Sequence, residues 1–424
     1  DEDLWKDDVR FDKSSPWNQA GTNRNYLHNR RRAGGESRLG VGKAPDTDHD
    51  RLQERLEAPE LAVSLPDGLH FHGGEEARLR QQINAALNSG RHLIFTGPPG
   101  TGKSKLAKAI ASQAATTAEI DGYTFTTATA EWSTFDTIGG YVPEQSGNGL
   151  EFDPRLFLDC FRDSEGSIHN QWLIIDELNR ANIDKALGPL FSVLSEDSVT
   201  LPYERDEQIS IEWVEEGDTT VEERRAIATS PDRFPITPAW RLIGTMNTFD
   251  KASLYDLSFA FMRRFSFIHV GVPELRTEDG VMKRALLDPA QRPNYVQTWA
   301  TDDSELMETI TAWHAEVSVV WSIINQYRTI GPAIVLDIFS HITAHSGGDD
   351  SAPLTSAIIN LIFPQLEALR ETEQHALLDE LADTHELAAA DDDESPTEVT
   401  LSVDLPYLRR KARDMFGITP ERGE

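Results

Sequence analysis

Residues 92–104 read HLIFTGPPGTGKS, an apolar run that breaks into glycines and ends on Lys103 and Ser104. The spacing G-x-x-x-x-G-K-[ST] between a strand and a helix is that of a phosphate-binding Walker A loop. Glycines let successive backbone N–H groups face phosphate oxygens, and the helix that follows presents its positive N-terminal end. We expect Lys103 to contact the β and γ phosphates and Ser104 to bind Mg²⁺. The predicted nucleotide-binding residues are Gly97, Pro98, Pro99, Gly100, Thr101, Gly102, Lys103, Ser104 and Lys105.

A second motif, WLIIDE, occupies residues 172–177. Its continuous apolar run predicts a strand buried on both faces that ends in two carboxylates. We interpret it as a Walker B element, in which Asp176 holds Mg²⁺ and Glu177 orients and deprotonates the attacking water. The alternative, a charge pair that opens a helix, is disfavoured by the Walker A loop about 70 residues earlier.

The composition is strongly acidic. Asp and Glu number 71 against 40 Lys and Arg, which gives a net charge of −31. Such a chain repels nucleic acid at low ionic strength, so bulk electrostatics do not predict a DNA or RNA binder. The low share of Lys resembles proteins of salt-accumulating halophiles; an ordinary acidic protein is the alternative. The single cysteine, Cys160, excludes an internal disulfide, and no apolar run reaches the ~20 residues of a membrane helix, so we expect a cytoplasmic protein without membrane contact.

Periodicity outlines the remaining elements. Apolar residues at helical spacing predict helices over residues 75–89, 103–115, 154–163 and 183–194. Further strands are expected near residues 123–130, 240–246 and 265–270, and residues 199–238 read as a hairpin followed by an irregular, charged insertion.

Both ends of the chain are expected to be less regular. Residues 1–66 predict an extended, flexible arm with one basic cluster, for which a solvated tail is favoured over contact with nucleic acid or with a neighbour's acidic surface. Residues 276–375 predict a small helical lid, and residues 376–424 an acidic linker with a terminal segment that either docks or remains solvated. The basic cluster comprises Arg24, Arg30, Arg31, Arg32, Arg38 and Lys43.

The motifs together resemble the AAA+ superfamily. Beside Walker A and Walker B, the resemblance rests on DELNRAN at residues 176–182, IGTMNTFD at 243–250 and FAFMRRFSF at 259–267. Within the superfamily the chain is most similar to the McrB-type NTPases of modification-dependent restriction systems and next to the MoxR-like chaperones, both of the dynein-related subfamily. The resemblance implies an α/β fold: a P-loop core over residues 67–275, with a five-stranded parallel sheet flanked by helices, and a C-terminal α-helical lid.

The resemblance also assigns residues. Asn247 matches sensor 1, which positions the lytic water, and Arg263 and Arg264 match the arginine-finger region that acts on a neighbouring subunit's nucleotide. Arg180 lies in a segment that the superfamily directs at the subunit interface. Phe249 replaces the usual Ala of the McrB-type MNTAD signature, which puts the guanine preference of that branch in doubt. Ala333 stands where a lid often carries a sensor 2 arginine, so greater dependence on a neighbour's arginines is expected.

These features predict a ring-forming, hexameric NTPase that hydrolyses ATP or GTP with Mg²⁺. Two functions follow from the resemblance. One is the motor of a restriction or defence complex, coupled to DNA through a separate nuclease subunit; the other is a MoxR-like chaperone that remodels protein complexes. A nucleotide-gated scaffold without turnover is disfavoured by Glu177.

Overall fold

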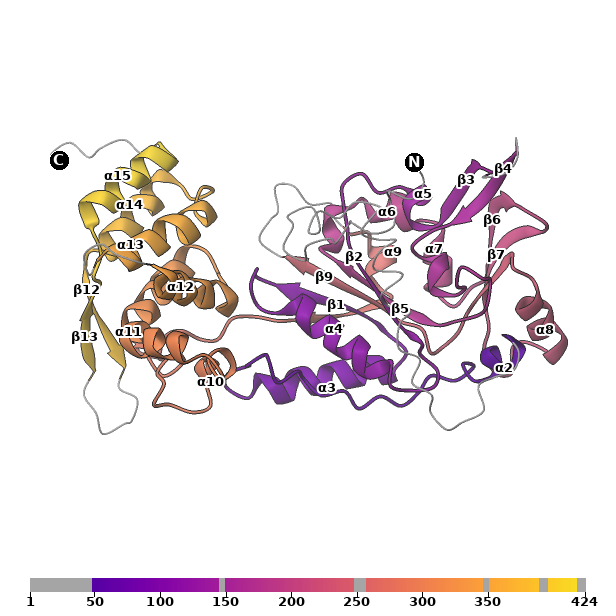
Figure 1. Ribbon diagram of the computed structural model, residues 1–424, viewed down its shortest axis with the longest axis horizontal. Coiled ribbons are helices and arrows are strands. Elements are labelled where there is room, and N and C mark those ends of the chain that lie inside the picture. The colour runs from indigo at the N-terminus through magenta and orange to yellow at the C-terminus, as the bar shows by residue number, and fades with distance from the viewer. Residues whose placement is uncertain (1–47, 145–148, 248–256, 346–350, 389–395, 418–424) are drawn as a thin grey trace, which may run out of the picture.

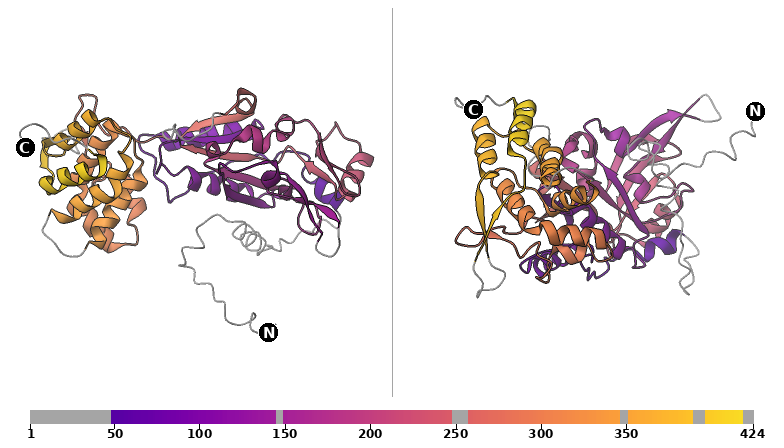
Figure 2. Two further views of the ribbon diagram at one scale, coloured as in Figure 1. Left: turned by 90° about the horizontal axis from the view of Figure 1, so that it is seen from above. Right: turned by 60° about the vertical axis from the view of Figure 1, so that its left-hand side comes forward.

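The computed structural model describes residues 48–144, 149–247, 257–345, 351–388 and 396–417. They form two lobes that lie side by side (Figures 1 and 2). The first lobe contains the parallel sheet, and the second is mainly helical. The basic cluster of residues 24–43 and the Phe249 position lie outside the described residues.

The first lobe is built on five parallel strands, as predicted. Their order across the sheet is β10-β1-β9-β5-β2, so the strand that leads into the Walker A loop is flanked on both sides. Leu93, Ile94 and Phe95 of β1 are fully buried, as the apolar run predicts. The strands are β1 (His92–Gly97), β2 (Gly122–Thr127), β5 (Gln171–Asp176), β9 (Leu242–Asn247) and β10 (Phe265–His269).

Helices α3 (Glu75–Asn88) and α4 (Lys103–Ala114) pack against this sheet (Figure 1). Helix α4 begins directly after the glycine loop and buries Leu106, Ala107 and Ile110 against the strands, which confirms the predicted apolar face. The loop and the first turn of α4 therefore have a rigid support.

Two predicted helices of the first lobe are wrong. Residues 154–163 contain the end of β4 (Leu150–Pro154), the 3-10 turn η3 (Leu158–Cys160) and a β-bridge at Arg162, because the N–H groups of Arg155 and Phe157 donate to the carbonyls of Ile138 and Thr137 and not to a helical partner. The expected helix over residues 183–194 is divided into α6 (Ile183–Leu187) and α7 (Leu190–Val193) by Gly188 and Pro189. Proline lacks the N–H that a continuous helix needs at this point.

Smaller elements surround the main sheet. The insertion at residues 199–238 contains the predicted hairpin, but helix α8 and a third strand follow it. A second hairpin, β3–β4, was not predicted. These elements are α5 (Thr134–Thr137), β3 (Gly139–Pro143), β4 (Leu150–Pro154), η4 (Leu178–Arg180), β6 (Val199–Glu204), β7 (Gln208–Trp213), α8 (Val221–Thr229), β8 (Arg233–Ile236) and α9 (Phe259–Met262).

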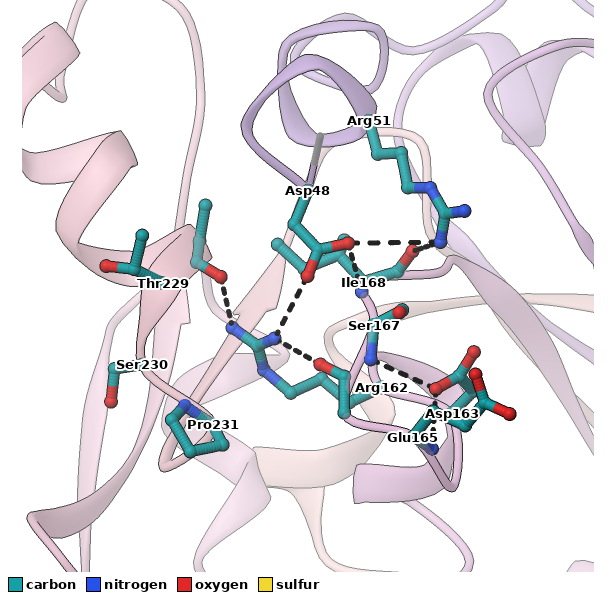
Figure 3. A network of polar contacts seen from close by, with 12 residues as sticks. Asp48, Arg51, Arg162, Asp163, Glu165, Ser167, Ile168, Thr229, Ser230 and Pro231 are labelled. Atoms are coloured by element: carbon teal, nitrogen blue, oxygen red, sulfur yellow. Dashed lines mark hydrogen bonds and ion pairs between the residues drawn. The ribbon is translucent and has the colours of Figure 1, made fainter. Parts of the chain in front are cut away.

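Residues 48–66 differ from the extended arm expected for them. Helix α2 (Asp48–Gln53) packs on α8, and Leu61 and Val63 are buried in the main core. Figure 3 shows the polar contacts around Arg162 that hold α2: its Nη1 lies 4.0 Å from an Asp48 carboxylate oxygen, while the other Asp48 oxygen accepts from the Ile168 N–H at 3.1 Å. This segment is a packed part of the first lobe.

The second lobe contains the predicted helices and more. Its helices are α10 (Tyr295–Trp299), α11 (Ser304–Tyr327), α12 (Pro332–Ala344), α13 (Ala352–Ala357), the π-helical η5 (Ile358–Ile362), η6 (Phe363–Gln365), α14 (Glu371–Glu380) and α15 (Leu405–Phe416). A three-stranded sheet of β11 (Met282–Lys283), β12 (Thr384–Ala388) and β13 (Thr397–Thr400) completes it.

The described residues of the acidic linker expected from residue 376 onward, 376–388 and 396–400, are instead part of this lobe. Leu381 and Leu387 are buried in the lobe's core although acids surround them in the sequence. The terminal segment is docked within its own lobe: Leu408 and Ala412 of α15 are fully buried, and the Phe416 ring centroid lies 5.2 Å from that of Phe363. The second lobe therefore extends to the last described residues.

Candidate nucleotide-binding site

The glycine loop lies at the carboxyl edge of the parallel sheet, between β1 and α4. Gly97, Gly100 and Gly102 all have positive φ, at 148°, 78° and 86°. A β-carbon on Gly97 would lie 2.1 Å from the Val270 carbonyl oxygen, so only glycine fits at this turn. The loop has the backbone that a phosphate cradle requires.

Lys103 points back into this loop. Its ammonium donates to the carbonyl oxygens of Gly97 at 3.0 Å and Pro98 at 2.6 Å, and the side chain is only 6% exposed. Burial lowers the Lys103 pKa to about 8, and the nearby carboxylates of Asp176 and Glu177 offset this in part. Phosphate oxygens in the loop would give the ammonium the negative partners that main-chain carbonyls supply only weakly.

Asp176 at the end of β5 meets the first turn of α4. One of its carboxylate oxygens accepts from the Ser104 hydroxyl at 2.5 Å and from the Thr245 hydroxyl at 2.5 Å. A hydroxyl and a carboxylate are oxygen ligands of the kind Mg²⁺ takes, usually with phosphate oxygens and waters completing its shell. Ser104 and Asp176 thus fit the predicted metal, which when bound would neutralise charge on the phosphates.

Glu177 occupies a constrained position beside Asp176. Its φ is 53°, in the left-handed region, and its N–H donates to the Thr245 hydroxyl at 3.0 Å. Asn247 at the end of β9 donates to one carboxylate oxygen at 3.3 Å, and Arg180 lies 2.9 Å from the other. The pairing of Gly97 with Asn247 in the β1–β9 register places this carboxylate and amide next to the loop. Such a carboxylate can act as a general base toward water above the loop.

The second lobe contacts the loop through main-chain hydrogen bonds. The Gly331 N–H donates to the Pro99 carbonyl at 3.0 Å, and the Ala333 N–H donates to the Gly100 carbonyl at 3.0 Å. A β-carbon on Gly331 would lie 2.4 Å from the Gly100 carbonyl carbon, so the two segments touch closely. The Ala333 side chain carries no charge, and the start of α12 contacts the loop through these main-chain groups.

The predicted site residues thus fall into two groups. Lys103, Ser104, Asp176, Glu177 and Asn247 converge at one edge of the sheet. The Lys105 ammonium points away from them and donates to the Gly68 carbonyl at 2.7 Å. Sequence reasoning missed Thr245, although its place two residues before Asn247 puts both on the same face of β9.

Arg263 and Arg264 form the second group, since they precede β10 and so lie at the opposite, amino edge of the sheet. Arg264 is held within its own chain: its Nε donates to the Ser195 hydroxyl at 2.6 Å, and its guanidinium lies 5.8 Å from the centre of the Phe191 ring. The Arg263 side chain is exposed, and among the described residues it has no hydrogen bond or ion pair. Neither arginine reaches the loop of its own subunit.

Part of the chain, including the glycine loop, matches a known protein family. Residues 92–265 match the family model of the AAA domain, dynein-related subfamily. No curated protein sequence matches the chain. Among solved structures, one from Cytophaga hutchinsonii ATCC 33406, provisionally described as an ATPase, shares 15% identity over 79% of this chain and 77% of that chain, with a TM-score of 0.30.

A second solved structure, NtrX from Brucella abortus in complex with ADP, shares 12% identity over 82% of this chain and 62% of that chain, with a TM-score of 0.36. Within the described residues, no helix is long and apolar enough to cross a membrane. Residues 92–265, which contain the parallel sheet and the glycine loop, thus match the AAA domain of the dynein-related subfamily.

Proposed function

We propose that this protein binds ATP with Mg²⁺ at the loop of its AAA domain and hydrolyses it within a ring of identical subunits. The convergence of Lys103, Ser104, Asp176, Glu177 and Asn247 at one sheet edge carries this proposal. Lys103 would bind the β and γ phosphates, Glu177 would take a proton from the attacking water, and Asn247 would orient that water and the carboxylate.

The proposed ring is supported by the positions of the site residues: the loop and the carboxylates lie at the carboxyl edge of the sheet, whereas Arg263 and Arg264 lie at its amino edge. Because Ala333 offers no cation, Lys103 is the one cation of this subunit predicted to contact the γ phosphate. An exposed arginine whose side chain has no partner within the described part of the chain is suited to reach a neighbour's nucleotide, and Arg263 has that character. We assign Arg263 as the arginine finger and Arg264 as the residue that anchors its segment, and we expect the ring to be a hexamer.

Turnover of ATP and GTP with Mg²⁺ tests the proposal. Glu177→Gln should leave nucleotide affinity intact and lower hydrolysis by roughly 10² or more, because the amide keeps the shape but cannot accept the proton. Lys103→Ala should abolish nucleotide binding at the glycine loop. A matched control is Glu308→Gln, which removes one exposed carboxylate from α11 in the second lobe. Full activity of Glu177→Gln would remove this residue from the mechanism.

For the biological role, we propose the motor of a McrB-like restriction or defence complex that acts on DNA through a nuclease partner. The stretch MNTFD at residues 246–250 and the adjacent arginines 263 and 264 support it. The net charge of −31 means that DNA contact would be indirect or confined to a local surface.

A second role, remodelling of protein complexes as in MoxR-like chaperones, is favoured by a different observation. The β3–β4 hairpin exposes Tyr141 at 43% and Leu150 at 64%, and nearby Phe135 is 42% exposed. Such side chains suit contact with a polypeptide better than with a phosphate backbone. The two roles separate in one measurement: DNA should stimulate ATP turnover at molar KCl in the first, and leave it unchanged in the second.

A further inference from the structure

A cavity of about 400 Å³ opens at the amino edge of the parallel sheet, at the opposite end from the glycine loop. Four arginines from three separate segments line it: Arg91 before β1, Arg241 before β9, and Arg263 and Arg264 before β10. Glu196 is the one acidic side chain in the lining. We call this space the arginine cavity.

Arg241 is the most deeply buried of the four arginines that line the cavity. It is only 5% exposed, and three of its N–H groups donate to main-chain carbonyls, those of Pro238, Trp240 and Leu87. Its buried Nε–H has no acceptor, and among the described residues no carboxylate lies within ion-pair distance of it. A buried guanidinium without a hydrogen-bonded anionic partner is costly, and Glu196 offsets the effect of burial on Arg241 only in part, so an anion bound in the cavity would stabilise it.

Two other arginines of the cavity, Arg91 and Arg264, also donate to uncharged acceptors. Arg91 donates to the Arg263 main-chain carbonyl at 2.5 Å, and Arg264 donates to the Ser195 hydroxyl at 2.6 Å, so both bonds go to neutral acceptors. Burial and the charges of Arg241, Arg264 and Arg91 lower the pKa of His92 to about 3, which keeps this cavity-lining imidazole neutral. Positive charge is therefore concentrated here in a chain whose net charge is −31.

We propose that the arginine cavity binds a phosphate-class oxyanion. Guanidinium groups that approach from several directions match the tetrahedral oxygens and double charge of phosphate better than the two coplanar oxygens of one carboxylate. The volume also accommodates more than one phosphoryl group, so the free ion and the phosphate chain of a nucleotide are two sources of the same chemistry. This site would be distinct from the glycine loop and would lie beneath the segment that carries Arg263.

Calorimetric titration of the full chain tests this in a Lys103→Ala background, where the glycine loop no longer competes for phosphate. Inorganic phosphate and ATP are titrated separately at one fixed salt concentration. At least one should bind saturably at one site per chain; tighter binding of phosphate assigns the free ion, and tighter binding of ATP assigns a nucleotide's phosphate chain. Because binding is read without turnover, a failure here leaves the hydrolysis proposal standing.

Two substitutions and one control locate the site. Arg241→Gln and Arg91→Gln should each weaken binding by tenfold or more, whereas Arg80→Gln, which removes the same charge from an exposed position on α3, should not change it. If Arg241→Gln fails to fold, the exposed Arg91 carries the test alone. Absence of saturable binding of either probe, or equal affinity in Arg91→Gln and Arg80→Gln, would overturn the proposal.

Discussion

Thr245 links the predicted metal ligand to the predicted base, and Thr245→Val removes that link while keeping the shape of the side chain. The hydroxyl donates to Asp176 at 2.5 Å and accepts from the Glu177 N–H at 3.0 Å. Losing the bond to a charged carboxylate costs about 1.5–3 kcal/mol, and leaving the Glu177 N–H without an acceptor costs about 1–3 kcal/mol. Burial of the methyl group that replaces the hydroxyl offsets about 0.8 kcal/mol of this loss in stability.

The expected net loss is about 2–5 kcal/mol in the free energy of unfolding, measured by urea titration in EDTA so that no metal contributes. Turnover should fall more than tenfold, because the left-handed conformation of Glu177 loses its anchor, while nucleotide affinity should change little. Thr245→Ser keeps the hydroxyl and serves as the control. Stability of Thr245→Val within about 0.5 kcal/mol of the parent, or equal damage from Thr245→Ser, would refute the reasoning.

Two further predictions follow from charge. Because the Lys103 pKa in the free loop is about 8, the ammonium is charged below that pH and neutral above it, so nucleotide affinity measured by calorimetry should fall by up to about tenfold from pH 7 to pH 9. Lys103→Arg should not show this dependence, and a flat profile for the parent protein would contradict the burial argument. If the −31 charge is an adaptation to high salt, the melting temperature should rise from about 0.1 M to above 1 M KCl as screening removes repulsion; a constant or falling value would count against it.

The residues of the candidate nucleotide site could be selected from the sequence because their motifs are local. Walker A and Walker B each occupy one strand and the residues that directly follow it, and parallel strands bring those ends to one edge. Thr245 was missed because a threonine within an apolar strand reads as a strand former; its role depends on the neighbouring strand that carries Asp176.

Other features depend on contacts between distant segments. The arginine cavity joins residues 91, 241 and 263–264, whose proximity no local spacing indicates. The second lobe continues past residue 376 because a few apolar side chains, among them Leu381 and Leu387, are buried although acids dominate the local composition. By contrast, the break between α6 and α7 was readable from Gly188 and Pro189.

Mixing of inactive subunits tests the central claim most directly. Arg263→Ala subunits keep an intact Walker site, and Lys103→Ala subunits keep an intact finger; each alone should be inactive, since such fingers contribute on the order of 10³ or more in rate. In rings that assemble at random from equal amounts, about one quarter of the interfaces pair an intact Walker site with an intact finger, so ATP turnover should recover to about that fraction of the parent protein's. A mixture that stays inactive, although size-exclusion chromatography with differently tagged subunits shows mixed rings, would contradict hydrolysis across the subunit interface.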